Sequence, residues 1–273
     1  MASSTVLKYP GSKGRIAEWI ISFFPRHIGY LEPYFGSGRV FFAKPRSRIE
    51  TINDIDGSVI NLFKVIRNYP DELARLIYFT PWSRLEYKDS YQDNENDNDI
   101  ERARKFLIRS WMAIGFKSSD VTGWRNNVKD LNGNISQWAY GLPSNILMIA
   151  NRLRSDGKNI VQIDNSPAID VIQRHCMETV LIYADPPYPL STRSGRIYKH
   201  EMTDEEHVEL IETLDNHPGP ALLSGYSCEL YDSRLKHWQR ETKITSAEGG
   251  RSREEVLWIN PVASKQITSY KLF

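Results

Sequence analysis

The chain has 273 residues, of which 40% are hydrophobic and 25% charged, and its formal net charge is +1. This composition predicts an ordinary globule with one large α/β domain, or one domain carrying an insertion, and excludes a global basic field for nucleic acid. Two cysteines, Cys176 and Cys228, give no disulfide framework. No apolar run is long enough to span a bilayer or to act as a leader, so we expect a cytoplasmic protein.

The first predicted element is a strand over residues 28–32, followed by a glycine-containing turn and a helix from Arg39. The glycines of this turn, residues 33–38, let the backbone approach a bound ligand closely. Their spacing is not that of a dinucleotide-binding fingerprint, and no Walker lysine follows. A second predicted strand over residues 49–53 ends at Asp54.

The middle of the chain has a different pattern. Between residues 58 and 151 the apolar side chains recur at helical spacing, and an acidic, asparagine-rich stretch over residues 89–101 predicts a solvated loop. We therefore predict a mainly helical insertion here.

Strand patterns return in the last part of the chain. They cover residues 159–163, 180–184, 221–224 and 255–259, with a further strand near residues 237–246. Thr203 and Glu206 have the spacing of a capping box and predict the start of a helix. The alternation of strands and helices at both ends of the chain predicts a mostly parallel sheet.

Asp185, Pro186, Pro187 and Tyr188 directly follow a predicted strand, at the strand end where open α/β sheets bind ligands. An amino group on a purine is a poor nucleophile, because its lone pair is delocalised into the ring. The Asp185 carboxylate and the Pro186 carbonyl are suited to accept its two hydrogens, and the prolines stiffen the backbone. Tyr188 offers a flat face for an extruded base. We predict that these residues are catalytic.

Four segments of the chain occur in the order found in one enzyme family. They are Lys-Tyr-Pro-Gly-Ser-Lys at 8–13, Glu-Pro-Tyr-Phe-Gly-Ser-Gly at 32–38, Asn-Asp-Ile-Asp at 53–56 and Asp-Pro-Pro-Tyr at 185–188. The chain thereby resembles the Dam-like, alpha-group adenine-specific DNA methyltransferases over nearly its whole length, least across the helical middle. The resemblance implies methyl transfer from S-adenosyl-L-methionine to the 6-amino group of an adenine in double-stranded DNA.

The resemblance also implies a Rossmann-like methyltransferase fold, an α/β structure with a mixed sheet of seven strands and one antiparallel strand near the end. Residues 58–151 would form an inserted, mainly helical target-recognition domain. Residues 1–57 and 152–273 would form the catalytic domain. No metal and no obligatory protein partner is implied.

Cofactor-binding roles follow from the resemblance at matching positions. Asp54 matches the acid that binds the ribose hydroxyls, with Asp56 as its rival, and Asp164 matches the acid near the cofactor's adenine. Asn165 departs from the family, in which many members have an aromatic residue there. The predicted cofactor-binding set is Tyr9, Lys13, Glu32, Pro33, Tyr34, Gly36, Ser37, Gly38, Asp54, Asp164 and Asp185.

Two further segments are predicted to contact DNA. Gly115 and Gly123 bracket a polar stretch whose side chains can read base edges or phosphates, and the resemblance places a DNA-contacting hairpin there. After the catalytic motif, a loop containing Arg196 predicts a flexible phosphate-binding segment. The predicted DNA-binding residues are Lys117, Ser118, Ser119, Trp124, Arg125, Asn126, Arg193 and Lys199.

Three alternatives stay open at this point. In the first alternative the methyl group goes to the 4-amino group of cytosine, and in the second the acceptor is RNA. In the third, the protein is a catalytically silent DNA-binding regulator built on the same fold. Aspartate at the first position of the catalytic motif favours adenine by resemblance, and the long insertion favours duplex DNA.

Overall fold

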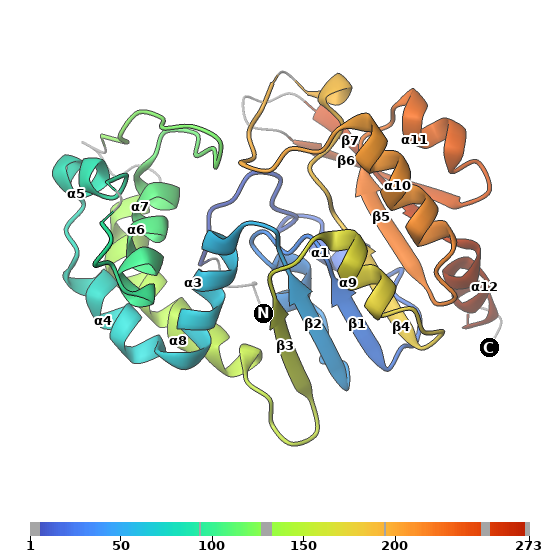
Figure 1. Ribbon diagram of the computed structural model, residues 1–273, viewed down its shortest axis with the longest axis horizontal. Helices are drawn as coiled ribbons and strands as arrows, with labels where there is room; N and C mark the ends of the chain where they lie inside the picture. Colours follow the sequence, from blue (N-terminus) through green and yellow to red (C-terminus); the bar gives the residue numbers. More distant parts are fainter. Residues whose placement is uncertain (1–5, 93, 127–132, 194, 247–251, 271–273) are drawn as a thin grey trace.

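A computed structural model describes residues 6–92, 94–126, 133–193, 195–246 and 252–270 of the protein, which are arranged around a seven-stranded sheet (Figure 1). The strands are β1 (Gly29–Glu32), β2 (Ile49–Asn53), β3 (Ile160–Asp164), β4 (Val180–Ala184), β5 (Ala221–Gly225), β6 (Gln239–Ser246) and β7 (Ser252–Ile259). They lie in the order β3-β2-β1-β4-β5-β7-β6, and β7 runs antiparallel to both of its neighbours. The predicted mixed α/β sheet is therefore confirmed.

The predicted strands agree with the structure except at their ends. The largest difference is at β7, which begins at Ser252 rather than Glu255. The added residues Arg253 and Glu254 are exposed and pair with β6. Hairpin pairing with β6 therefore extends this strand beyond its buried part. The sequence did not predict the extension, because exposed residues show no pattern of burial.

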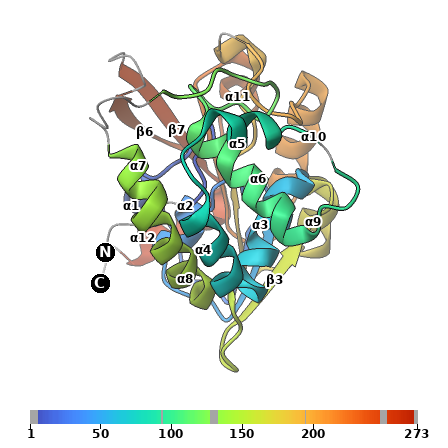
Figure 2. The same ribbon diagram turned by 90° about the vertical axis from the view of Figure 1, so that its left-hand side faces the viewer.

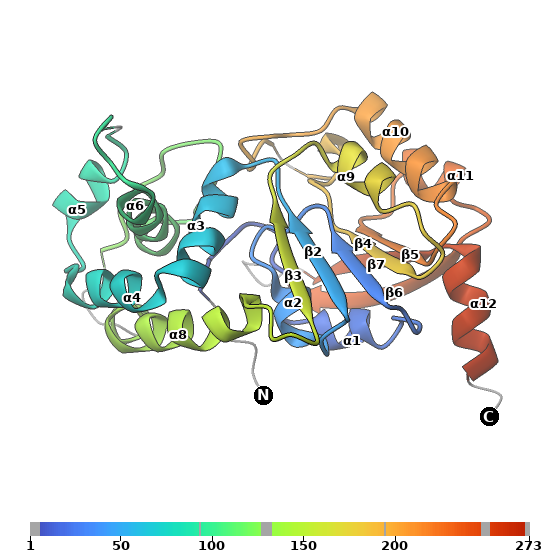
Figure 3. The ribbon, with the colours of Figure 1, turned by 60° about the horizontal axis from the view of Figure 1, so that its bottom comes forward.

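Helices cover both faces of the sheet (Figures 1 and 3). One face carries α9 (Ala168–Arg174), α10 (Asp204–Asp215) and α11 (Glu229–Arg234), and the other carries α1 (Ala17–Ile21), α2 (Arg39–Ala43) and α12 (Pro261–Tyr270). Side chains alternate between the two cores along β4, where Ile182 packs under α10 and Tyr183 packs on the opposite face. No helix in the described part of the chain is long and apolar enough to cross a membrane.

The chain between β2 and β3 is mainly helical, as predicted, and lies beside the β3 edge of the sheet (Figure 1), so that its helices face the viewer in Figure 2. We call this segment the helical insertion. It consists of α3 (Gly57–Asn68), α4 (Pro70–Phe79), α5 (Arg84–Asp89), α6 (Asp99–Met112), α7 (Asn134–Ser136), the π-helix η1 (Gln137–Gly141) and α8 (Leu142–Leu153). Its buried side chains are continuous with the core under α1 and α2. The domain boundaries near residues 58 and 151 stay a prediction.

Side-chain caps decide where several of these helices begin. Asp56 accepts a hydrogen bond from Ser58 N at 2.9 Å and starts α3. Asn98 accepts from Glu101 N at 2.9 Å and starts α6, so the predicted loop over residues 89–101 ends earlier than expected. The predicted capping box at the start of α10 is confirmed.

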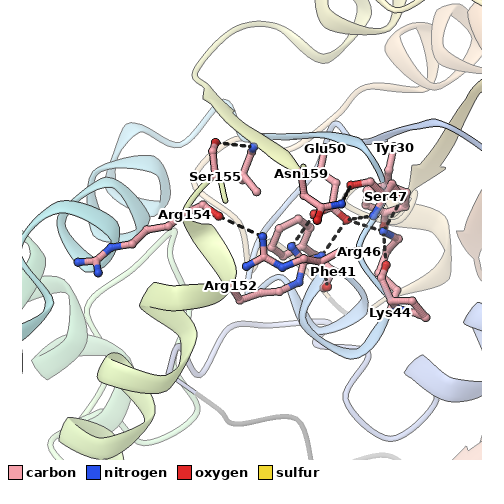
Figure 4. Close-up of polar contacts among 12 residues, drawn as sticks. Tyr30, Phe41, Lys44, Arg46, Ser47, Glu50, Arg152, Arg154, Ser155 and Asn159 are labelled. Atoms are coloured by element: carbon pink, nitrogen blue, oxygen red, sulfur yellow. Dashed lines mark hydrogen bonds and ion pairs between the residues drawn. The ribbon is translucent and has the colours of Figure 1, made fainter. Parts of the chain in front are cut away.

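A buried carboxylate joins the helical insertion to the sheet. Glu50 of β2 has no exposed surface and accepts hydrogen bonds from Lys44 Nζ at 2.6 Å and Arg152 Nη2 at 2.8 Å (Figure 4). Arg152 lies in the last turn of α8, and its guanidinium stacks 3.8 Å from the ring centroid of Phe41 in α2. Burial alone would raise the pKa of Glu50, but the two cations hold it below its ordinary value. The ionised carboxylate therefore fixes α2, β2 and α8 together.

Removing one partner of this network should be costly, because the remaining charges stay buried without compensation. We expect Glu50→Ala to lower the free energy of unfolding by about 3–5 kcal/mol, measured by urea denaturation. The control is Arg102→Ala, which breaks an exposed ion pair with Asp99 and should cost about 1 kcal/mol or less. Equal losses in the two variants would contradict a role for Glu50 in joining the insertion to the sheet.

Candidate active site

A cavity of about 1200 Å³ opens at the carboxyl ends of β1, β2 and β4. Parallel strands bring the loops that follow them to one edge, where α/β proteins bind ligands. Residues that line the cavity fall within segments 9–13, 32–40, 54–56, 119–120, 167–170, 183–191 and 196–209. Ten of the predicted cofactor-binding residues are among them, namely Tyr9, Lys13, Glu32, Pro33, Tyr34, Gly36, Ser37, Gly38, Asp54 and Asp185.

The turn after β1 depends on glycine at two positions. Gly36 and Gly38 have φ angles of +49° and +63°, and a Cβ atom at Gly38 would lie 2.3 Å from the Phe35 ring. At the end of β1, the buried carboxylate of Glu32 accepts a hydrogen bond from the Tyr30 hydroxyl at 2.7 Å. Burial raises the pKa of Glu32 to about 8. The turn thus offers the cavity a bare backbone beside a carboxyl group that titrates near neutral pH.

Asp54 connects the loops after β1 and β2. Its carboxylate accepts hydrogen bonds from Gly36 N at 2.8 Å and from Asp56 N at 2.9 Å. Burial raises the pKa of Asp54 to about 7. Asp56, its rival from the sequence, also lines the cavity, but its carboxylate caps α3. Asp54 is therefore the carboxylate that is built into the wall between the two loops.

Asp164 is placed differently from the sequence expectation. Among the described residues it does not contribute to the cavity wall, and its carboxylate is held by Ser166 Oγ at 2.9 Å and Arg174 Nη2 at 2.8 Å. The wall beyond β3 comes instead from residues 167–170. The neighbouring Asn165 donates to Asp54 O at 2.7 Å, so this position braces a loop rather than offering a stacking face.

Asp185 forms an ion pair with Lys13 inside the cavity. Lys13 Nζ lies 2.9 Å from Asp185 Oδ1 and also donates to Gly11 O at 2.8 Å. Burial raises the pKa of Asp185, while Lys13 opposes that shift. Burial has the opposite effect on Lys13 and would lower its pKa, but the carboxylates of Asp185 and Glu255 hold that pKa above its ordinary value. Lys13 therefore favours the charged form of Asp185, which burial disfavours.

Tyr188 is buried beside this pair, and two residues that the sequence analysis missed surround it. Its hydroxyl donates to Glu255 Oε2 at 2.8 Å, and its ring lies edge-on to Tyr226, with 4.6 Å between the centroids. Lys13 Nζ lies 4.7 Å from the centroid of the Tyr188 ring. Tyr226 directly follows β5, and that position at a strand end was the signal that could have identified it. Glu255 had only one weak signal, an acidic residue at the start of a predicted buried strand.

The two segments predicted to contact DNA lie against each other. A hairpin forms where Ala113 pairs with Trp124, and it reaches across to the loop after β4. Ser118 N donates to Ile197 O at 3.0 Å, and Ser118 Oγ accepts from Lys199 N at 3.0 Å. Both segments reach the cavity, because Ser119 and Lys199 belong to its wall. Lys117 and Asn126 are exposed.

Other residues of the predicted DNA-binding set hold the structure together. Trp124 is half-buried beneath the guanidinium of Arg84, and Arg125 donates to Ala113 O at 3.1 Å. Arg193 differs most from the expected flexible loop. It forms an ion pair with Glu201, and its Nε donates to Tyr188 O at 2.7 Å. Both side chains of that pair are nearly buried, so Arg193 braces the loop from within.

Comparisons with known proteins agree with the order of motifs. The family of D12 class N6 adenine-specific DNA methyltransferases matches residues 9–252. The Type II methyltransferase M1.LlaDCHI of Lactococcus lactis subsp. cremoris is 26% identical over 263 residues, covering 90% of this chain and 89% of that protein.

Among solved structures, a precorrin 8w decarboxylase from Methanobacterium thermoautotrophicum is 8% identical and covers 92% of this chain and 91% of its own. Its TM-score of 0.37 is too low to carry an argument. The family match instead spans the glycine turn, the helical insertion and the Asp-Pro-Pro-Tyr motif. The chain belongs to the D12 class N6 adenine-specific DNA methyltransferase family, and its activity is the methylation of adenine in DNA.

Proposed function

We propose that this chain transfers the methyl group of S-adenosyl-L-methionine to the 6-amino group of an adenine that has swung out of double-stranded DNA. One observation carries the proposal. The carboxylate of Asp185 lies in the wall of the same cavity as Asp54 and the glycine turn after β1. A carboxylate suited to the acceptor and groups suited to the donor therefore face one open cavity.

The residues of the cavity fit this donor in shape and charge. The turn at Gly36 and Gly38 lets the backbone approach, and the carboxylates of Glu32 and Asp54 match a ligand with a positively charged sulfur. When bound, such a donor supplies an already activated methyl group. Asp54 would accept hydrogen bonds from its ribose hydroxyls. The same cavity wall contains the remaining residues that we propose to hold it, Tyr9, Lys13, Pro33, Tyr34 and Ser37.

Asp185 and the carbonyl of Pro186 would accept the two amino hydrogens of the adenine and free its lone pair for attack. This requires an ionised carboxylate, because a protonated one would donate instead of accepting. Lys13 favours the ionised form against the effect of burial. The remaining contribution of the protein is positioning, because the donor needs no further activation.

The extruded base would stack on Tyr188, which lies three residues beyond Asp185 in the same loop. Unpairing and unstacking cost a few kcal/mol. Hydrogen bonds to Asp185 would offset part of that cost, and an aromatic face contributes roughly 1–3 kcal/mol per base. Because the family's acceptor is adenine in DNA, the cytosine and RNA alternatives are not supported. A catalytically silent regulator is distinguished by the first experiment below.

Asp185→Ala should fold normally and lose methyl transfer. Removing a group that acts mainly in the transition state should lower the rate by at least about 100-fold, measured as labelled methyl incorporated into duplex DNA and identified after digestion to nucleosides. Glu212→Ala removes an exposed carboxylate and serves as the control. A rate like that of the unmodified protein in folded Asp185→Ala would refute the catalytic assignment. An unmodified protein that binds DNA but transfers no methyl group would be the silent regulator.

Donor binding should strengthen as the pH rises. The folded pKa of Asp54 is raised to about 7, so part of this carboxyl is protonated at neutral pH and cannot accept fully from the ribose. Affinity by calorimetry should increase by up to about tenfold between about pH 6 and about pH 7.5, below the titration of the donor's own amino group. Asp54→Asn should flatten this dependence and weaken binding by about 1.5–3 kcal/mol. Unchanged affinity in Asp54→Asn would move the ribose role to Asp56.

Two residues of the hairpin, the exposed Lys117 and the half-buried Ser119, should act on DNA and spare the donor. Lys117→Ala should weaken binding to all sequences alike and reduce the slope of log affinity against log salt by about 0.9, as expected for one phosphate contact. Ser119→Ala should change sequence preference if this side chain reads a base edge. Lys88→Ala on α5 is the control. If neither hairpin change alters DNA binding or preference, the hairpin is a scaffold.

A further inference from the structure

Tyr188 is held in place by residues from four separate parts of the chain. Glu255 of β7 accepts from its hydroxyl at 2.8 Å, and Arg193 Nε donates to its backbone carbonyl at 2.7 Å. Tyr226 packs edge-on, and the ammonium of Lys13 lies near the ring centroid. The phenol hydrogen bond is the anchor that attaches to the far end of the side chain.

Glu255 is an unusual residue at its position. The residue is only 9% exposed, on a strand whose next four residues, 256–259, are all buried and apolar. A buried carboxylate is retained at little cost only when its oxygens have partners. The Tyr188 hydroxyl supplies one partner, and the charge of Lys13 supplies a favourable field. Glu255 is therefore matched to the catalytic loop rather than to its own strand.

The segment that carries the catalytic motif has little regular structure of its own. Residues 185–189 form neither helix nor strand, and the two prolines donate no backbone hydrogen bonds. The orientation of the Tyr188 ring therefore depends on contacts from outside this segment. We propose that Glu255 is a positioning residue for methyl transfer, which acts by holding the phenol of Tyr188 and so the plane on which the target base stacks.

This inference rests on the proposed function, because it assigns Tyr188 the extruded base. It goes further by giving β7, the antiparallel strand of the sheet, a direct part in the active site. A misplacement of about 1 Å at a reacting centre can cost about 100-fold in rate. Loss of the phenol anchor should therefore reduce the rate of the chemical step and leave donor affinity unchanged.

The test is a double-mutant cycle on the single-turnover rate of methyl transfer, with Glu255→Ala, Tyr188→Phe and the double variant. Each single change should lower the rate roughly 10- to 100-fold, and the double variant should be little slower than either one. Glu255→Gln keeps an oxygen that accepts from the phenol and should restore most of the rate. Glu254→Ala is the matched control, because this neighbouring carboxylate lies on the exposed side of β7 beside Arg240.

A second readout follows the base itself. In duplex DNA with 2-aminopurine at the target position, Glu255→Ala and Tyr188→Phe should change the fluorescence in the same way, and Glu254→Ala should match the unmodified protein. If Glu255→Ala does not fold, Glu255→Met fills a similar volume without a carboxylate and replaces it in the cycle.

Three results would overturn the inference. Equal fold losses from Glu255→Ala with and without the Tyr188 hydroxyl would show that Glu255 acts elsewhere. Rates unchanged in folded Glu255 variants would show that it does not act on the reaction. If the unmodified protein transfers no methyl group to duplex DNA, the proposed function fails and the inference fails with it, whereas the first two results leave that function standing.

Discussion

The buried ion pair between Glu50 and Arg152 sets how the two parts of the molecule are arranged. It joins the last turn of α8 to the start of β2, close to where the chain returns from the helical insertion to the sheet. The insertion leaves the sheet at α3, whose first turn is capped by Asp56 at the cavity wall. With both ends of the insertion fixed in this way, its hairpin reaches the loop after β4. The relation between the hairpin and the cavity thus depends on contacts at the two ends of the insertion.

The cavity contains more carboxyl groups than cations. Several carboxyl groups face a space with few cations, and burial raises the pKa of Asp54 and of Glu32 toward neutrality. Lys13 is the cation beside Asp185, where an ionised carboxylate is needed. Lys13 therefore opposes the effect of burial on the pKa of Asp185, whereas burial alone dominates at Asp54 and Glu32.

The sheet and most of the cavity wall could be predicted from the sequence, because short local patterns of residues indicate both. Strands appear as short apolar runs, and Gly36, Asp54 and Asp185 stand at strand ends, where parallel topology gathers them without any knowledge of packing. The place of Glu255 in the site could not be predicted, because it depends on a hydrogen bond from Tyr188, which is far away in the chain. Arg193 was predicted to bind DNA in a flexible loop because its contacts with Glu201 and with the Tyr188 carbonyl cannot be read from the sequence. Contacts between distant segments leave no periodic trace in a single sequence.

The contact between the hairpin and the loop after β4 limits how freely the insertion can be exchanged between related enzymes. Ser118 binds backbone groups of both Ile197 and Lys199, so the loop that follows the catalytic motif is shaped by a residue of the insertion. Grafting the insertion alone into a related enzyme would leave those backbone groups facing an unrelated surface. A chimera that keeps these hydrogen bonds would need residues 58–151 and 196–199 to be exchanged together. A change in the hairpin at Ser118 would therefore also change the shape of the cavity wall at residues 198–199.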